Sequence, residues 1–305
     1  MDKMKIIILL LLIVTNISCN NSIQTDSAIV FIPGWKEGET KIVNSIYKVI
    51  QSNDYDSSIV MIENSYKINV DEVSQEGFIL SIELLKSEIN SYPELVEIDE
   101  FLQEYNELSQ GVIFKLKFDI KGHYKDFINW KDVRDYFYNI TDTIAFRIKS
   151  GEIPANTNIN EEIINEVKLD YSTKENLSAK LLKTILSYFD IYYLELHPNE
   201  TKKEYLPILS KTDSVYYLRK NEYKETKDEL HLRTYTLTDS SQIKKLNAII
   251  LNNKLYWRAA EILDAYMNTL EENEYFINRK NYWINYQRTV SHYDNTSIIQ
   301  EYSSP

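Results

Sequence analysis

The feature that most constrains the fold of this chain is a strict alternation of apolar and polar residues. Residues 66–71 read Tyr-Lys-Ile-Asn-Val-Asp, and residues 113–118 read Ile-Phe-Lys-Leu-Lys-Phe. Successive side chains of a strand point to opposite faces, so this pattern is typical of antiparallel strands with one buried and one solvated face. Lys121-Gly122 after the second stretch predicts a hairpin turn, with a return strand over 123–128.

Further strands are predicted from short apolar or alternating runs bounded by turn residues. Residues 40–51 also fit a helical face, but their β-branched content and the turn residues on both sides favour a strand. Together the predicted strands cover 28–32, 40–51, 58–63, 66–73, 78–84, 112–120, 123–128, 214–219, 229–237, 275–277, 282–289 and 297–302.

Helices are predicted where a capping residue precedes an apolar face of helical period. Ser91 starts the first, Asn129 the second, and Ser172-Thr173-Lys174-Glu175 forms a capping box for the third. The second helix carries the stripe Trp130, Val133, Phe137, Ile140 and Ile144 and stops at Gly151. Two more helices are expected over 243–250 and 256–270, after the turn and cap at 238–240.

The order of these elements predicts an α+β fold over residues 28–305. We expect one or more curved antiparallel sheets with helices packed on one face. Each half of the chain runs from strands to a helix and then to a hairpin. Two similar lobes, 28–152 and 153–305, are therefore one interpretation, and ordinary alternation of helices and strands is the other.

The N-terminus predicts export. Lys3 and Lys5 precede the uncharged residues 6–14, a run too short for a membrane-spanning helix, which needs about 20 residues. Cys19, the only cysteine, follows directly after Ser18. Without a second cysteine no internal disulfide forms, so the core must stabilise the fold. The 43% hydrophobic content is sufficient for a packed core.

The Asn16-Ile17-Ser18-Cys19 stretch resembles the lipobox of bacterial lipoprotein precursors, although Asn16 stands where an apolar residue is usual. The resemblance implies cleavage between Ser18 and Cys19, removal of the signal peptide 1–18, and acylation of Cys19, for example with palmitate. It also implies a lipidated tether over 19–27 and a protein anchored to a membrane of the cell envelope, facing the periplasm or the cell surface. An ordinary signal cut near Ser18, which leaves a free thiol, is the alternative.

Two further passages carry a second resemblance. Phe118-Asp119-Ile120-Lys121-Gly122-His123-Tyr124 with Asn129-Trp130, and the Leu- and Tyr-rich segment 172–193, resemble segments of bacterial lipoproteins without assigned chemistry. They cover under a quarter of the chain. This resemblance implies a location and an architecture only.

Composition and motifs exclude several classes of function. A net charge of −12 argues against binding to nucleic acid. Only six glycines are present, they fit turns or helix ends, and no phosphate-binding loop occurs. The four histidines, His123, His197, His231 and His292, do not form a zinc motif. No cofactor is therefore expected.

Two clusters are weak metal candidates. Glu195, His197 and Glu200 would hold a divalent ion only if Pro198 turned the chain back, and a solvated loop explains them better. Asp54-Tyr55-Asp56 lacks the glycine and the final carboxylate of a calcium loop, so a hairpin turn is favoured. No metal site is predicted.

The four tryptophans offer either a sugar-stacking surface or core packing. Trp130 and Trp257 lie at helical spacing among apolar residues and are predicted to be core. The other two are Trp35 and Trp283. Trp35 follows Pro33-Gly34 in a loop and is predicted to be the most exposed of the four.

The leading hypothesis is a non-enzymatic, lipid-anchored protein of the cell envelope that binds another envelope macromolecule as an accessory or scaffold component. The first alternative is a carrier that holds an apolar ligand inside a curved sheet. The second is a glycan or peptide hydrolase, which would need two carboxylates, or a nucleophile and a base, in one cleft. No catalytic or ligand-binding residue is assigned.

Overall fold

The main element of the fold is one antiparallel sheet of eleven strands. The computed structural model describes residues 22–24, 29–52, 57–92, 104–152, 165, 168–169, 171–197, 201–207, 214–252, 270–293 and 296–305. The sheet order is β7-β6-β5-β4-β3-β14-β13-β12-β11-β10-β9, and every neighbouring pair is antiparallel. The strands are β3 (Thr40–Ser52), β4 (Ser57–Ser74), β5 (Gly77–Tyr92), β6 (Ile113–Asp119), β7 (Tyr124–Phe127), β9 (Thr201–Pro207), β10 (Ser214–Glu225), β11 (Glu229–Thr238), β12 (Leu270–Asn278), β13 (Ile284–Tyr293) and β14 (Thr296–Ser303).

A second, three-stranded sheet joins distant segments in the order β1-β2-β8. It consists of β1 (Ser22–Gln24), β2 (Ile29–Phe31) and β8 (Glu195–Leu196). The strand expected over 28–32 is confirmed, since β2 pairs with both of its neighbours.

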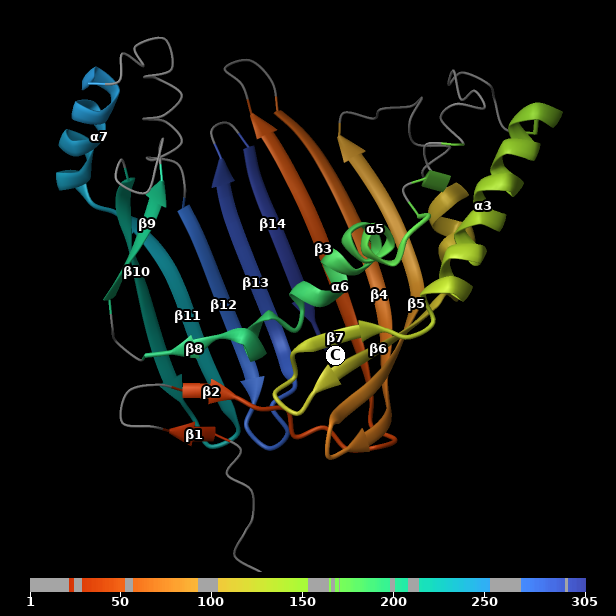
Figure 1. The fold of residues 1–305 in the computed structure, drawn as a ribbon, viewed down its shortest axis with the longest axis horizontal. Coiled ribbons are helices and arrows are strands. Elements are labelled where there is room, and N and C mark those ends of the chain that lie inside the picture. Colours follow the sequence, from red (N-terminus) through yellow and green to blue (C-terminus); the bar gives the residue numbers. More distant parts are fainter. Residues whose placement is uncertain are drawn as a thin grey trace, which may run out of the picture.

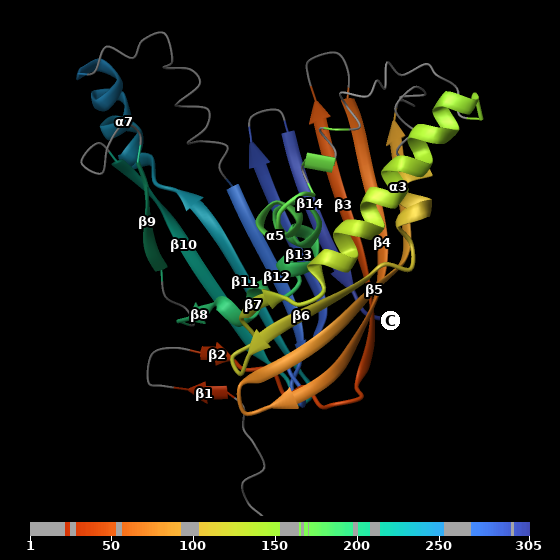
Figure 2. The ribbon, with the colours of Figure 1, turned by 45° about the vertical axis from the view of Figure 1, so that its right-hand side comes forward.

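Most of the helical residues that the structure describes belong to three segments. α5 (Lys174–Leu177), the π-helix η1 (Ser178–Leu182), α6 (Lys183–Ser187) and the 3₁₀-helix η2 (Asp190–Tyr193) form a nearly continuous segment, here called the plug. Figures 1 and 2 show the sheet curving around the plug, with α3 (Trp130–Ser150) beside β5 and β6 and α7 (Ser240–Asn252) beside β9 and β10. A further helical turn covers 104–109.

The plug binds one face of the sheet, which we call the inner face. Tyr188 Oη donates to the carbonyl of Ile284 at 2.8 Å, and Gln287 Nε2 donates to the carbonyl of Ser187 at 2.9 Å. Side chains of alternating strand residues on this face are buried, including Val43, Ile68, Leu80, Leu116, Leu232 and Tyr302.

On the outer face, ion pairs connect neighbouring strands. Arg233 contacts Glu272 at 2.8 Å, and Arg288 contacts Glu301 at 2.8 Å. Charged side chains that stay hydrated in this way are typical of a solvent-facing sheet surface. The stretches 66–71 and 113–118 show the single-face burial that their alternation predicts, whereas Val290 is buried on the outer face of β13.

An aromatic cluster fills the space between the plug and the lower half of the sheet. Trp35 is only 3% exposed, so the prediction that it is the most exposed tryptophan is wrong. Its indole stacks on Trp283 at 5.0 Å between ring centroids and contacts Phe78, Phe118, Phe189 and Tyr192 edge-on. These rings come from segments far apart in the sequence, which explains why the local sequence around Trp35 gave no sign of its burial.

The strands are longer than predicted. Two strands were expected over 58–63 and 66–73, but β4 runs unbroken from Ser57 to Ser74 and absorbs bulges at Ser65/Tyr66 and Val70/Glu72. Ser91 pairs with Val60 inside β5, so its predicted role as a helix cap is wrong. The residues between Tyr92 and residue 104 lie outside the described part of the chain.

The predicted cap of α3 has a different role. Asn129 makes no side-chain cap; its Oδ1 instead accepts from the Lys115 amide at 2.8 Å and its Nδ2 donates to the Ile113 carbonyl at 2.9 Å. Asn129 therefore ties the helix start to the edge of β6. The predicted stripe of α3 is buried at Val133, Phe137, Ile140 and Ile144, whereas Trp130 is half-buried. Thr173, rather than Ser172, caps α5 by accepting from the Asn176 amide at 3.2 Å.

Both halves of the chain build the same sheet. β14 from the C-terminal half pairs with β3 from the N-terminal half between Thr296↔Gln51 and Ser303↔Asn44. The boundary near residue 153 lies outside the described residues. Whether the two halves are related stays a prediction.

Candidate ligand-binding site

Most residues singled out from the sequence do not meet in one site. Ser18, Cys19, Trp257 and Glu200 lie outside the described residues. Glu195 lies in β8 and is exposed. Within the described part of the chain, no group of three His, Cys, Asp or Glu side chains is arranged to hold a metal ion.

The remaining predicted candidates have local partners. Asp54 and Asp56 lie outside the described residues, between the paired strands β3 and β4. His123 Nε2 lies 3.0 Å from the carbonyl of Tyr192, and His231 Nε2 lies 2.8 Å from Glu274. His231 belongs to the ion-pair ladder of the outer face, and His123 holds the β6–β7 turn against the plug.

The site that the structure suggests instead is the inner face beyond the plug. In Figures 1 and 2 the ends of β3, β4, β13 and β14 that are drawn uppermost extend past α5 and α6. We call this region the upper inner face. Strand register places its side chains in two rows that cross the sheet. The middle row is Asn221, Thr234, Asn273, Thr289, Gln300, Tyr47 and Ile62, and the upper row is Arg219, Thr236, Glu271, Ser291, Ile298, Val49 and Val60.

On β14, β3 and β4, the upper inner face is apolar. It carries a half-buried block that we call the apolar block, consisting of Tyr47, Val49, Val60, Ile62 and Ile298. No charged side chain interrupts the block, since register pairs its members with one another and with Gln300. The outer face at the same level differs, because Lys48 lies between Ile299 and Met61 and Ile46 lies between Glu301 and Glu63.

On β10 to β13, the upper inner face is polar. Thr289 Oγ1 donates to Asn273 Oδ1 at 2.7 Å, and Asn273 Nδ2 donates to Glu271 Oε1 at 2.7 Å. Gln300 Nε2 donates to Ser187 Oγ at 2.8 Å, which connects the row to the plug. The two rows therefore change from hydrogen-bonding groups to hydrocarbon at β14.

Some polar atoms of the inner face are buried without a hydrogen-bond partner. They are Asn221 Oδ1, Thr234 Oγ1 and Gln287 Oε1, on residues that are 6%, 1% and 2% exposed. Asn221 and Thr234 face each other across β10 and β11. Leaving such an atom unpaired costs about 1–3 kcal/mol, so these three atoms lower the stability of this part of the sheet.

Two carboxylates interact electrostatically at the polar side. Burial, and then the charge of Glu271, raise the pKa of Asp190 to about 6. Asp190 is nevertheless an exposed residue of the plug. Burial is the main reason why the pKa values of Tyr275 and Tyr302 are raised, and the negative charge of Asp190 raises both of them further.

This site was missed in the sequence although its strands were predicted. Tyr47 and Val49 alternate with Lys48, which is a signal for one apolar face. The partner strands that complete the block were identified as strands, but their register cannot be read from single-strand patterns. The polar residues on β10 to β13 could not be recognised as part of a site, because Asn, Thr and Gln in strands have no characteristic spacing.

Comparison with known proteins finds similarity among solved structures. No protein-family model and no curated protein matches the chain. A solved structure described as "Lipid-protein interactions in lipovitellin" aligns with a TM-score of 0.42 and 9% identity over 88% of this chain. The aligned region is 25% of that chain, so the present protein spans about a quarter of its length.

Proposed function

We propose that this chain binds an apolar or amphiphilic small molecule on the upper inner face and acts as its carrier. The observation that supports the proposal most is the apolar block, whose five side chains are half-buried on the inner face without an interleaved charge. Covering exposed hydrocarbon with a ligand is favourable by about 25 cal/mol per Å². In this proposal the helices lie on one face of the sheet, as the sequence predicts, and leave the block open to a ligand.

The polar side of the upper inner face, on β10 to β13, favours an amphiphile over a pure hydrocarbon. A ligand whose chain lies on β3 and β4 would place its polar end over β12 and β13, beside Asn273 and Glu271. Asp190 and Glu271 outnumber the one cation of the upper row, Arg219, so this end carries a net negative charge. A neutral or cationic head group is therefore expected to bind better than a carboxylate of the same chain length.

Equilibrium binding of the neutral fluorescent probe N-phenyl-1-naphthylamine, and its displacement by dodecanol, tests the proposal. Val49→Asp places a charge in the apolar block and should weaken binding at least about tenfold, which corresponds to about 1.4 kcal/mol. Ile50→Asp is the matched control, because Ile50 is the next residue of β3, is also half-buried, and faces the opposite side. Equal loss in both variants, or no saturable binding to the unmodified protein, would contradict the proposal.

The lipid anchor on Cys19 and the location in the cell envelope belong to the same proposal. The support is the N-terminal pattern of the sequence, with Cys19 as the only cysteine. No described helix has both the length and the apolar character that crossing a membrane requires. Cys19→Ser should abolish acyl labelling and release the protein from membranes; retention of that variant in the membrane fraction at high salt would argue against the anchor. An accessory role toward another envelope macromolecule remains compatible with such an anchor.

A hydrolase is the second candidate, and one observation favours it. Asp190 has a pKa of about 6 and interacts electrostatically with Glu271. A carboxylic acid with a raised pKa, together with a second carboxylate, is a common acid–base arrangement in glycosidases. Turnover of nitrophenyl glycosides that disappears in Asp190→Asn, while probe binding persists, would favour this candidate over the carrier.

A further inference from the structure

A hollow lies where β14 ends. β3 pairs with β4 from Thr40 onward but with β14 only from Asn44, so β3 and β13 diverge around an opening below Ser303. The opening, here called the notch, has a volume of about 410 Å³ and is lined by residues 39–42, 281, 283, 285 and 304–305. It lies at the opposite end of the strands from the upper inner face.

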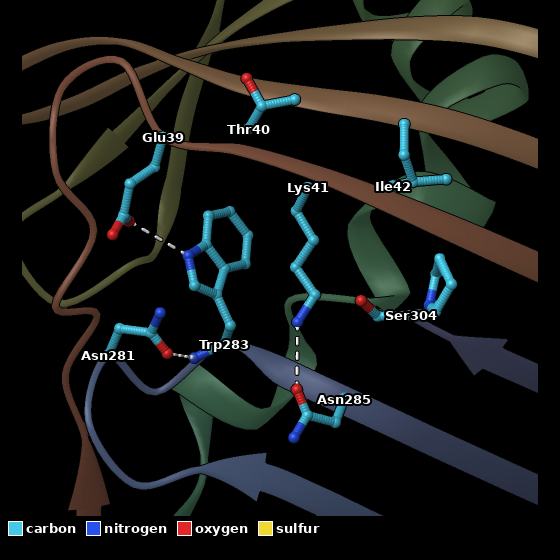
Figure 3. Close-up of a pocket in the computed structure, with 9 residues that line it drawn as sticks. Glu39, Thr40, Lys41, Ile42, Asn281, Trp283, Asn285 and Ser304 are labelled. Carbon is cyan, nitrogen blue, oxygen red and sulfur yellow. Dashed lines mark hydrogen bonds between the residues drawn. The ribbon is translucent and has the colours of Figure 1, made fainter.

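The notch contains a lysine with a single hydrogen-bond partner. Lys41 Nζ donates to Asn285 Oδ1 at 3.2 Å and lies 5.6 Å from the centre of the Trp283 ring. Figure 3 shows the Lys41 side chain extending from β3 across the notch to Asn285 on β13. No described carboxylate lies within ion-pair distance of this ammonium group.

The nearest acid is held elsewhere. Glu39 Oε2 accepts from Trp283 Nε1 at 3.2 Å and from the Lys36 amide at 3.0 Å. Figure 3 shows Glu39 on the far side of the indole from Asn285. Burial lowers the pKa of Lys41 to about 8, and Glu39 only partly opposes this effect. A half-buried ammonium group without an ion-pair partner would be stabilised electrostatically by an anion that enters the notch.

The other polar groups of the notch add donors. Asn281 Oδ1 accepts from the Trp283 amide at 3.3 Å, which leaves its Nδ2 group for another partner, and Ser304 contributes a hydroxyl group. Figure 3 shows Ser304 near Lys41, and Asn281 beyond Trp283. Lys41 is the only cationic side chain among the residues that line the notch, and Glu39 is an acid among them. A singly charged carboxylate therefore fits the notch better than a phosphate dianion, which Glu39 would repel more strongly and which would need further cations.

We propose that the notch binds a small hydroxylated monocarboxylate, such as a sugar acid, with its carboxylate on the ammonium group of Lys41. The amide and hydroxyl groups of Asn281 and Ser304 would bind hydroxyl groups of the same ligand. This inference is independent of the upper inner face, since the two sites share no residue.

The test is titration of the full chain with glucuronate, with lactate as a smaller monocarboxylate and glucose as the uncharged control. Binding is followed by calorimetry and by the NMR signal of the Trp283 indole N–H. We expect glucuronate to bind with a Kd of about 1 mM or tighter. Glucose should not bind, and glucuronate affinity should fall as the pH rises above 8, because Lys41 loses its proton.

Two variants make the result specific. Lys41→Met should weaken glucuronate binding at least about tenfold. Asn285→Asp should do the same with the lysine still present, since the new carboxylate would pair with it. Lys48→Met, on the opposite face of β3, is the control and should leave binding unchanged. Absence of saturable binding of both acids, equal binding of glucose, or full affinity in Lys41→Met would overturn the proposal.

Discussion

At the scale of single residues, burial in this protein depends on partners that are distant in sequence. The rings around Trp35 come from β5, β6, the plug and the β12–β13 turn. The stripe of α3 was predictable because its period lies within one helix. Trp130 shared that period but is only half-buried, with Arg134 at 5.4 Å from its ring. Helical spacing identified the correct face there without indicating how completely each position is covered.

The two tryptophans are therefore expected to differ in their contribution to stability. Trp35→Ala should lower the free energy of unfolding by about 3–5 kcal/mol, because it leaves a cavity among five aromatic rings. Trp130→Ala should cost about 1–2 kcal/mol, since solvent already reaches its ring. Denaturant unfolding of both variants gives the comparison; an equal cost would mean that the cluster around Trp35 is not the centre of the core.

Asp190 predicts a dependence of stability on pH. Its pKa of about 6 in the folded protein lies above the ordinary value of 3.8, so the folded state binds more protons between these values. Stability should therefore fall as the pH rises from about 4 to about 6 and then level off. Asp190→Asn should remove this component and raise stability at pH 7 by about 1 kcal/mol, after allowance for solvent screening of an exposed group. A variant with an unchanged pH profile of unfolding would contradict the assignment.

At the scale of elements, most strands of the large sheet were predictable, but their lengths were not, and β1, β8 and β9 were not predicted at all. Alternation located β3, β4, β6, β11 and β13 within a few residues. The bulges in β4 interrupt the period, which is why one strand of 18 residues looked like two. Capping residues were also ambiguous, because the Asn129 side chain forms its hydrogen bonds with the backbone of β6 and does not cap its own helix.

The β4–β5 turn requires a glycine for a reason visible only in the sheet. Gly77 has φ of +140°, and a Cβ atom there would lie 2.0 Å from the carbonyl oxygen of Phe118. Gly77→Ala should therefore cost more than about 2 kcal/mol, from backbone strain and displacement of β6. Gly38→Ala is the control, because its φ is also positive but a Cβ atom would have no neighbour within 4 Å; it should cost about 1 kcal/mol. Similar thermal melts for the two variants would argue against the close contact with β6.

At the scale of the whole molecule, the α+β class and the large antiparallel sheet were predictable from the sequence. The way in which β14 closes the sheet against β3 was not, because that pairing joins residues about 250 positions apart. The candidate site depends on the same pairing. The apolar block exists only when β14, β3 and β4 lie side by side in this register, so no local pattern could have revealed it.

The central claim is that a ligand lies on the upper inner face. The most direct measurement is photo-crosslinking of the full chain with an aliphatic alcohol that carries a diazirine, followed by mass spectrometry of the labelled residues. The account predicts labelling of Tyr47, Val49, Val60, Ile62 and Ile298, suppressed by excess dodecanol. Labelling that is concentrated on Ile46, Ile50 and Met61 of the outer face, or that dodecanol does not suppress, would contradict it.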